Sequence, residues 1–363
     1  MSRPPVIAAF LGAQTLGDFA YLHVQATSVA RQIPGSKLVV LYRDDRPYKN
    51  VINLLNPYVT ATVKVPADPN FVIPIDWFDG EDKGESGAFD PSWYAQGVHK
   101  PDVLITPSML DFGRYIPPPP RLRVPDSMVP LLHRSLTLRG LDENRWFACV
   151  HVREAGYEHR PGFDTRRNVD VRAYFLVIAH IVQAQGGQVV RLGDPSMTPL
   201  PPIPNVVDLS RETGNFPEEV FALSRARYFF GTDTGPTQLA SALKVPLALT
   251  NALGVCLWND GDVVLFKNFE DKTGSPLPLE VVRHIGMSLL NLELRDVRFR
   301  DNHPDTLIAV ADHMFEITRD CPGWRDTWPE DPEPSATTLE LPVAWRDVAT
   351  ELDFTYWPPS GAS

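Results

Sequence analysis

The stretch from Arg227 to Asn251, RYFFGTDTGPTQLASALKVPLALTN, decides the fold of this chain. Its two ends are aromatic or aliphatic and have the composition of short buried strands. Between them, Thr232 to Pro236 form a tight turn, and Thr237 to Leu243 are small or apolar residues that suit a helix. Pro236 fits the start of that helix, because its missing N–H would have no intrahelical acceptor there. This order of strand, turn, helix and strand predicts a parallel sheet.

The turn also predicts an anion site. A glycine-bearing loop that opens a helix beside a parallel sheet presents free backbone N–H groups and the positive end of the helix dipole. A phosphate or diphosphate fits such a site. The alternative is an ordinary strand–helix connection in which an aspartate caps the helix. The residues expected to bind are Asp233, Thr234, Gly235, Pro236, Thr237 and Gln238.

These residues resemble the D-[ST]-G-P-x-H-L-A-x-A-L signature of the bacterial heptosyltransferase family and its relatives. In those glycosyltransferases the segment wraps the donor nucleotide diphosphate. Gln238 stands where the family usually has His, and glutamine can donate to a phosphate only as a neutral amide. The resemblance therefore implies a diphosphate pocket without fixing the family's donor. The matching positions are Asp233, Thr234, Gly235, Pro236, Leu239, Ala240, Ala242 and Leu243.

A second motif lies near the start of the chain. Val6 to Gly17, VIAAFLGAQTLG, reads as an apolar strand that runs into a glycine loop, and Asp18 then precedes a helix predicted over Phe19 to Gln32. The family has a similar Gly-Asp at this turn, and its Asp is the proposed catalytic base, which implies the same role for Asp18. A carboxylate at a helix N-terminus is also stabilised in its charged form, which fits a helix cap. The two roles are compatible.

The third motif is FACVHVRE, from Phe147 to Glu154. It reads as a strand that places His151 and Arg153 on one face. Arginine at the carboxyl end of such a strand lies where open α/β sheets bind ligands, and its planar fork matches a phosphate. The H-x-R resembles that of GDP-fucose-dependent fucosyltransferases, where the Arg holds the donor diphosphate. Glu154 is expected to pair with a nearby Arg, and the alternative is a hydrogen bond to a ribose or sugar hydroxyl.

The region from Ala148 to Asn251 also resembles a sparse bacterial family identified from sequence alone as glycosyltransferases. The shared pattern is H-V-R-E, then R-N, then G-G-x-V-V-R-L-G-D. It adds Arg167 and Arg191 to the residues expected around the donor diphosphate. The resemblance does not name the sugar.

Composition narrows the class of protein. The 363 residues are 43% hydrophobic and 22% charged, which is typical of a globular protein long enough for two domains. A net charge of −11 argues against a nucleic-acid partner, which would need a basic face. No apolar run is long enough to span a membrane and the start lacks signal-peptide features, so we expect a cytoplasmic protein. Three scattered cysteines fit a reducing compartment.

Strands and helices alternate in both halves, which predicts the α/β GT-B fold: two Rossmann-like domains with a cleft between them. We expect an N-terminal acceptor-side domain over 1–130, with the proline-rich stretch from Pro117 to Pro130 as its exit. A nucleotide-sugar-binding domain follows over 131–300. Residues 301–363 contain a helix from Asp305 to Ile317 and a Pro- and Trp-rich tail, which in this fold class often returns to the first domain.

The expected activity is transfer of a hexosyl, heptosyl or fucosyl group from a nucleotide-diphosphate sugar to a glycan, lipid-linked, protein or small-molecule acceptor. No cofactor and no metal are expected, since arginines can stabilise the leaving diphosphate. Asp260 and Asp262 have the D-x-D form of metal-dependent glycosyltransferases, but the surrounding residues favour a tight turn. Two alternatives remain: a sugar-nucleotide epimerase of the same fold, or a non-catalytic sugar-nucleotide-binding protein.

Overall fold

The computed structural model describes residues 4–11, 13, 15–43, 45–65, 103–105, 121–154, 165–254, 261–282 and 297–320. The chain divides into two compact units, with the boundary between Arg123 and Val124. Each unit is built around its own parallel sheet. The loop predicted at 79–91 and the tail beyond residue 320 lie outside the described residues.

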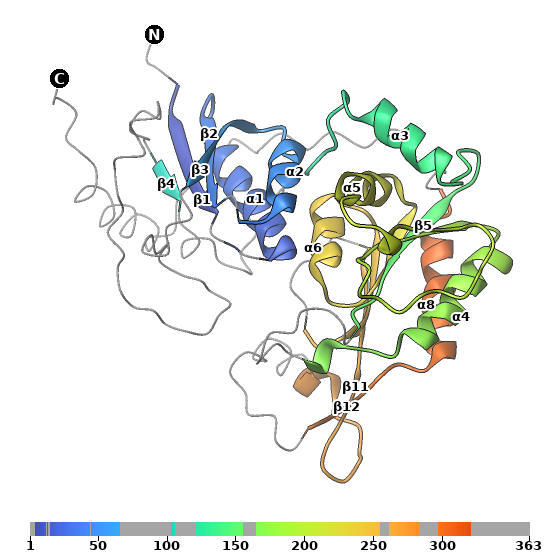
Figure 1. Cartoon of the computed structure of the whole chain (residues 1–363). Helices are drawn as coiled ribbons and strands as arrows, with labels where there is room; N and C mark the ends of the chain where they lie inside the picture. The colour runs from blue at the N-terminus through green and yellow to red at the C-terminus, as the bar shows by residue number, and fades with distance from the viewer. Residues whose placement is uncertain are drawn as a thin grey trace, which may run out of the picture. The chain divides into compact units, whose positions relative to one another are not determined.

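The first unit contains a four-stranded parallel sheet in the order β3-β2-β1-β4 (Figure 1). Two helices, α1 and α2, connect the first three strands. The elements are β1 (Val6–Leu11), α1 (Leu16–Ala30), β2 (Lys37–Arg43), α2 (Pro47–Leu55), β3 (Val59–Val65) and β4 (Val103–Ile105). The continuous apolar runs of β1 and β2 are buried, as expected for inner strands of a parallel sheet.

A buried histidine joins α1 to α2. His23 on α1 is fully buried, and its ring contacts the side chains of Asn53 and Asn56 at 2.8 and 3.1 Å. Burial lowers the pKa of His23 to about 4, which the hydrogen bond to Asn53 only partly offsets. The ring is therefore neutral near pH 7 and serves as a satisfied polar group of the core.

The second unit contains a six-stranded parallel sheet in the order β10-β9-β8-β5-β6-β7. Counted along the unit, the first strand lies in the middle, with the second and third on one side and the later strands on the other. This is the strand order of the Rossmann fold. The strands are β5 (Phe147–His151), β6 (Gln188–Arg191), β7 (Val206–Asp208), β8 (Tyr228–Gly231), β9 (Leu247–Ala252) and β10 (Val263–Phe266).

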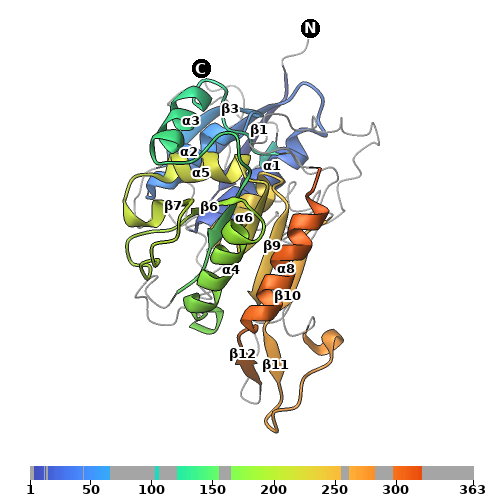
Figure 2. The ribbon, with the colours of Figure 1, turned by 90° about the vertical axis from the view of Figure 1, so that its right-hand side faces the viewer.

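Helices cover both faces of this sheet. α4 (Val171–Gln183) and α8 (Pro304–Ile317) lie side by side on one face, whereas α5 (Phe216–Arg225) and α6 (Gly235–Ala242) lie on the other (Figures 1 and 2). α3 (Val129–Leu138) packs against α5, and Ser135 donates a hydrogen bond to Glu218. The predicted C-terminal helix is thus confirmed as α8.

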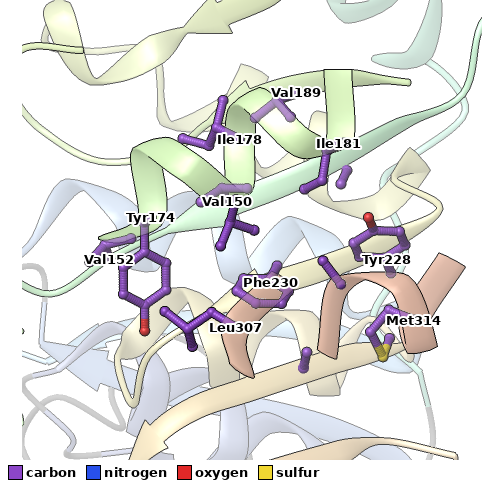
Figure 3. Packing of buried hydrophobic residues seen from close by; sticks show 14 of the residues in the cluster. Val150, Val152, Tyr174, Ile178, Ile181, Val189, Tyr228, Phe230, Leu307 and Met314 are labelled. Atoms are coloured by element: carbon purple, nitrogen blue, oxygen red, sulfur yellow. The ribbon is translucent and has the colours of Figure 1, made fainter. Parts of the chain in front are cut away.

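The core under α4 and α8 follows the strand alternation. Val150 lies in β5 and Val152 directly after it. Both pack against Tyr174, Phe230 and Leu307 in this layer (Figure 3). Every second residue of β5 therefore points towards α4 and α8, and the residues between them, including His151, belong to the other face. This alternation places the polar motif residues on the side of α6.

Several expected boundaries were wrong. α1 begins at Leu16 rather than at Phe19, so Asp18 lies inside the helix. α3 was not predicted, because its start was assigned to the proline-rich exit of the first domain; proline fits a helix start as well as a linker. The antiparallel pair β11 (Asn268–Glu270) and β12 (Arg298–Arg300) was also missed. Within the described residues, no helix combines the length and apolar character needed to cross a membrane.

Candidate phosphate-binding site at the carboxyl ends of β5 and β8

The centre of the second sheet is its topological switch point. β5 and β8 are adjacent and parallel, but the chain leaves them towards opposite edges of the sheet. Open α/β sheets bind ligands at this point, outside the carboxyl ends of the strands. His151 and Gly231 are register partners at these two ends. A side chain at Gly231 would clash with the carbonyl oxygen of His151, so glycine permits the close approach of the strands.

The two motifs expected from the sequence meet at this switch point. The backbone N–H of Arg153 donates to Thr232 Oγ1 at 2.9 Å, and the N–H of Thr232 donates to the carbonyl of His151 at 3.2 Å. The hydroxyl of Thr234 lies 3.1 Å from Nδ1 of His151. Segments about 80 residues apart in the sequence therefore form one hydrogen-bonded surface.

His151 is buried within this surface. Burial lowers the pKa of His151 to about 3, and the nearby charges of Arg191 and Arg153 lower it further while Asp194 opposes them. The ring is neutral near pH 7. His151 therefore positions the turn through Thr234 and brings no positive charge to a ligand.

The turn between β8 and α6 is folded by its own threonines. The hydroxyl of Thr237 donates to the carbonyl of Thr232, and Thr234 Oγ1 lies 3.2 Å from the same carbonyl. Thr234 is the N-cap residue of α6, but its side chain makes no capping hydrogen bond. The first N–H groups of a helix have no intrahelical acceptors, so this helix start retains the capacity to bind an anion.

The N-cap position of α6 is taken by Thr234 and not by Asp233, which corrects the alternative interpretation of the turn with regard to Asp233. Its carboxylate instead lies 3.8 Å from Nη1 of Arg167, and both side chains are partly exposed. Arg167 ends the 3₁₀ turn η3 (Thr165–Arg167), which comes after β5 in the chain. The structure thus brings Arg167 to the same turn as the predicted phosphate contacts. Gly235, Pro236 and Gln238 are half-buried at the start of α6.

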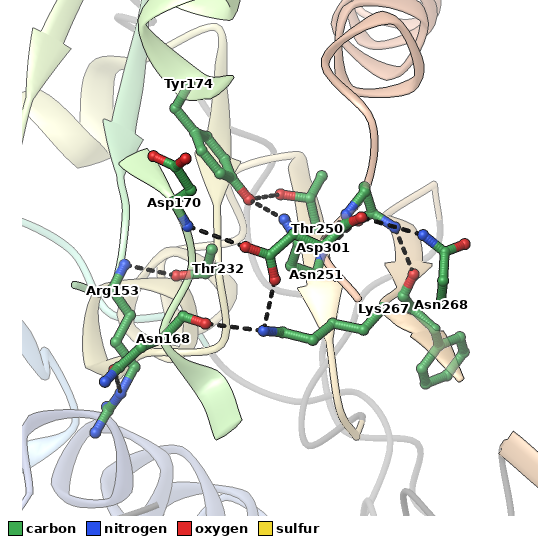
Figure 4. A network of polar contacts seen from close by, with 12 residues as sticks. Arg153, Asn168, Asp170, Tyr174, Thr232, Thr250, Asn251, Lys267, Asn268 and Asp301 are labelled. Carbon is green, nitrogen blue, oxygen red and sulfur yellow. Dashed lines mark hydrogen bonds and ion pairs between the residues drawn. The ribbon is translucent and has the colours of Figure 1, made fainter. Parts of the chain in front are cut away.

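Arg153 is a buried arginine at this surface. It is 5% exposed, and its Nε–H donates to the side-chain oxygen of Asn168 at 3.2 Å (Figure 4). Its carbonyl accepts a hydrogen bond from the N–H of Val169 at 3.1 Å. Both contacts come from the segment that follows Arg167. The guanidinium is therefore oriented by neighbours at the carboxyl end of the strand.

Arg191 lies in a different environment. Its side chain is buried, with Nη2 2.9 Å from Glu154 Oε1 and Nη1 3.5 Å from Asp208 Oδ2. Nη1 also donates to the carbonyl of Thr198 at 2.8 Å. The expected pairing of Glu154 with an arginine is confirmed. Arg191 has internal acceptors for its charge, so we do not include it among the proposed phosphate contacts.

Asp18 belongs to the first unit. It is the third residue of α1, where the hydroxyl of Thr15 donates to its carboxylate. Thr15 is the N-cap and accepts from the N–H of Asp18 at 3.4 Å. The interpretation of Asp18 as the cap residue was therefore wrong. The cap was visible in the sequence as a threonine three residues before an acidic residue, the spacing of a capping box.

The D-x-D sequence has a structural role at its second aspartate. Asp262 Oδ1 accepts from the N–H of Leu247 at 3.1 Å, beside β10, and Gly261 has a positive φ of 90°. Asp260 lies outside the described residues. Over the ranges that the structure describes, no group of three or more His, Cys, Asp or Glu side chains is arranged to hold a metal ion.

Sequence reasoning missed the residues that surround Arg153. Thr232 was part of the quoted turn, and Asn168 was part of the R-N pattern, but neither was chosen as a site residue. Lys267 and Asp301 had no sequence signal, because their contacts to Asn168 and Asp170 span about 100 residues or more. Only the folded sheet brings these side chains together.

No protein-family model matches this chain, and no curated protein matches it. Among solved structures it is similar to "the glycosyl transferase family 9 from Veillonella parvula DSM 2008", with a TM-score of 0.55, 11% identity, and coverage of 87% of this chain and 99% of that chain. It is also similar to an E. coli "ADP-heptose lps heptosyltransferase II", with a TM-score of 0.52, 12% identity and the same coverages. At such low identity the likeness shows the fold. The predicted α/β GT-B class is thereby confirmed.

Proposed function

We propose that this chain is a glycosyltransferase that moves a sugar from a nucleotide-diphosphate donor to a nucleophile of an acceptor. One observation carries the proposal: Arg153 and the turn that opens α6 are hydrogen-bonded to each other at the switch point of a Rossmann-like sheet. Each element alone suits a phosphate. Because they are adjacent in a GT-B fold, a diphosphate could bind both the Arg153 side chain and the N–H groups at the start of α6.

The proposed donor site uses charge and helix geometry together. Arg153 and Arg167 supply positive charge, and the first turn of α6, from Thr234 to Thr237, supplies backbone N–H groups and the helix dipole. Asp233 is the acidic member of the group and orients Arg167. Negative charge grows on the diphosphate as the glycosidic bond breaks, and fixed donors at that position stabilise it. This account needs no metal ion.

The acceptor needs a base, and we propose Asp18. Its carboxylate accepts the Thr15 hydroxyl, which fixes its orientation at the start of α1. It is 5% exposed, and its position in the first helical turn after β1 corresponds to the position that the resemblance implies for the base. Asp45 is the described alternative in this unit, but it lies 2.7 Å from the ammonium of Lys49.

Calorimetric titration with ADP, GDP and UDP tests the donor site. ADP comes first, since one structural neighbour is named for an ADP-heptose donor. We expect one diphosphate to bind the wild type, and Arg153→Ala to weaken its binding by about 2–4 kcal/mol, the scale of a lost buried charge-assisted contact. Equal affinity of variant and wild type would refute the assignment.

A second measurement separates transfer from the epimerase alternative. A transferase releases the free nucleoside diphosphate only when an acceptor nucleophile is present, whereas an epimerase needs no acceptor. We therefore expect release to depend on added acceptor. Diphosphate-sugar isomerisation without an acceptor would favour the epimerase.

A further inference from the structure

A buried lysine lies behind the proposed diphosphate site. Lys267 directly follows β10 and is 6% exposed. Its ammonium donates to the backbone carbonyl of Asn168 and to Asp301 Oδ1, each at 2.8 Å (Figure 4). A buried ammonium is stable only with an opposite charge and further hydrogen bonds, and these two partners supply both.

The same asparagine holds the site arginine. The carbonyl of Asn168 is bound by Lys267, while its side-chain oxygen accepts the Nε–H of Arg153 at 3.2 Å. Fixing the backbone of Asn168 therefore fixes the acceptor that orients the guanidinium. The contacts therefore run from Lys267 through Asn168 to Arg153, the side chain proposed to bind the phosphate.

The second oxygen of Asp301 closes this arrangement. It accepts the backbone N–H of Asp170 at 3.0 Å, so one carboxylate joins Lys267 to the segment two residues after Asn168. Asn268 donates its side-chain amide to the carbonyl of Asp301 at 3.2 Å. The segment from Asn168 to Asp170 is thus held at both ends, beside Arg153, by Lys267, which directly follows β10, and by Asp301, which directly follows β12.

The geometry at Arg153 explains why such support matters. An arginine side chain has many rotamers, and a bidentate phosphate contact requires one orientation of the guanidinium plane. Asn168 engages Nε, which is distinct from the two terminal nitrogens that carry the other four N–H groups. Anchoring the guanidinium at Nε selects its orientation without using the terminal nitrogens.

We propose that Asn168, Lys267 and Asp301 are positioning residues that set the orientation of Arg153 for a diphosphate ligand. The inference rests on the proposed function, because these residues can position Arg153 for a diphosphate only if Arg153 binds one. The competing explanation is that the Lys267–Asp301 pair only ties together three segments of the unit and contributes to stability alone. The two explanations differ in whether the network acts through Arg153.

A double-mutant cycle on the full-length protein separates them. The measured quantity is the dissociation constant of the tightest binder among ADP, GDP and UDP, with inorganic pyrophosphate as a second probe. The variants are Asn168→Ala and Lys267→Met, each in the wild-type and in the Arg153→Ala background. Asn168 is half-buried, so its truncation is the variant expected to fold if Lys267→Met does not.

Gln188→Met is the matched structural control. Gln188 is also buried and makes three hydrogen bonds to Asp142 and Arg145, but it lies at the opposite, amino-terminal end of β6. We expect it to lower the melting temperature without changing the dissociation constant. It shows what a loss of internal hydrogen bonds does when Arg153 is not involved.

We expect Asn168→Ala to weaken diphosphate binding about five- to tenfold in the wild-type background, the scale of one ordinary intramolecular hydrogen bond. In the Arg153→Ala background the same substitution should change the affinity less than twofold, because the network then has nothing to orient. Lys267→Met should follow the same pattern.

Two results would overturn the inference and leave the proposed function standing. One is an unchanged affinity in Asn168→Ala while Arg153→Ala binds weakly. The other is an equal loss in both backgrounds, which would mean that Asn168 contacts the ligand itself. A wild-type protein that binds none of the diphosphates would overturn the proposed function and this inference together.

Discussion

Two strand–helix turns, one in each unit, differ in how the start of the helix is satisfied. At the start of α1, Thr15 caps the helix and its hydroxyl holds the carboxylate of Asp18 in the first turn. At the start of α6, Thr234 makes no capping bond, and two arginines lie beside the switch point instead. The same element of structure thus presents a carboxylate in one unit and, in the other, the surface proposed to bind the diphosphate.

The side chains, rather than the backbone fold, create this difference. Both turns follow an inner strand of a parallel sheet, so both helix starts have the same direction of dipole and N–H groups without intrahelical acceptors. A self-capped helix start with its own carboxylate disfavours a phosphate. An uncapped start with nearby guanidinium groups favours one. This difference agrees with the proposed function, in which the base belongs to the first unit and the donor diphosphate to the second.

The largest expected effect concerns the carboxylate. Asp18→Asn should lower turnover by about 10²-fold or more, the scale of losing a general base, while donor affinity stays unchanged. The amide keeps the size of the side chain but cannot accept the proton of the acceptor. Steady-state kinetics and calorimetry on the same preparation measure both quantities. Near-normal turnover with a lower melting temperature would make Asp18 a structural residue, and Asp45 would be tested next.

A second effect is the loss of stability in acid, because each unit buries a neutral histidine. The pKa of His23 falls to about 4 and that of His151 to about 3, both below the unfolded value of 6.5. The unfolded chain therefore binds more protons, and the stability present above pH 6.5 is lost as the pH falls towards 4 and 3. The expected slope is about 1.4 kcal/mol per pH unit for each group.

Chemical denaturation at pH 7.5, 6.0 and 5.0 measures this dependence. The control is His23→Gln, which removes one titrating group and should reduce the slope for the first unit. Burial raises the pKa of Glu219 to about 8, and this group has the opposite pH dependence, so the decisive quantity is the difference in slope between the wild type and His23→Gln. An equal slope in both proteins would show that the ring of His23 is not held neutral.

A smaller effect tests the cap of α1. Thr15→Ala should destabilise the protein by about 1 kcal/mol, since it removes the side chain that accepts the N–H of Asp18. Thr15→Ser keeps the hydroxyl and should retain most of the stability. Nucleotide affinity should be unaffected by either change. If the alanine variant is as stable as the wild type, α1 is not capped as described.

The smallest expected effect is that of metal removal. Two arginines and the start of α6 are proposed to stabilise the leaving diphosphate, so EDTA should leave turnover unchanged. Loss of turnover in EDTA and its recovery with Mn²⁺ or Mg²⁺ would contradict this. Asp260 and Asp262 would then be the first residues to replace.

The sequence predicted the strands of the two sheets better than the side-chain contacts between distant segments. Long apolar runs identify buried parallel strands, and the turn after β8 is visible from Gly235 and Pro236 alone. Short elements such as β11 and β12 carry too few residues for a pattern, and α3 begins in a proline-rich stretch that also fits a linker. The length of a periodic segment therefore decides how well it is predicted.

The candidate site was predicted only in part. His151, Arg153 and Thr234 come together because adjacent parallel strands end at the same edge of the sheet. The contact of Arg191 with Asp208 and that of Asn168 with Lys267 were not predictable, since contacts between distant segments leave no spacing in the sequence. The position of a strand end can be predicted from the local sequence, whereas the pairing of buried charges depends on how the whole unit folds.

Hydrogen–deuterium exchange with and without the tightest-binding nucleoside diphosphate tests the central claim most directly. We predict that the nucleotide slows exchange in peptides that cover His151 to Glu154 and Gly231 to Ala240, because its phosphates bind the N–H groups at the start of α6. Arg153→Ala should abolish this protection at the same nucleotide concentration. Unchanged exchange over both segments, with protection confined to the start of α1, would contradict the assignment of the donor site.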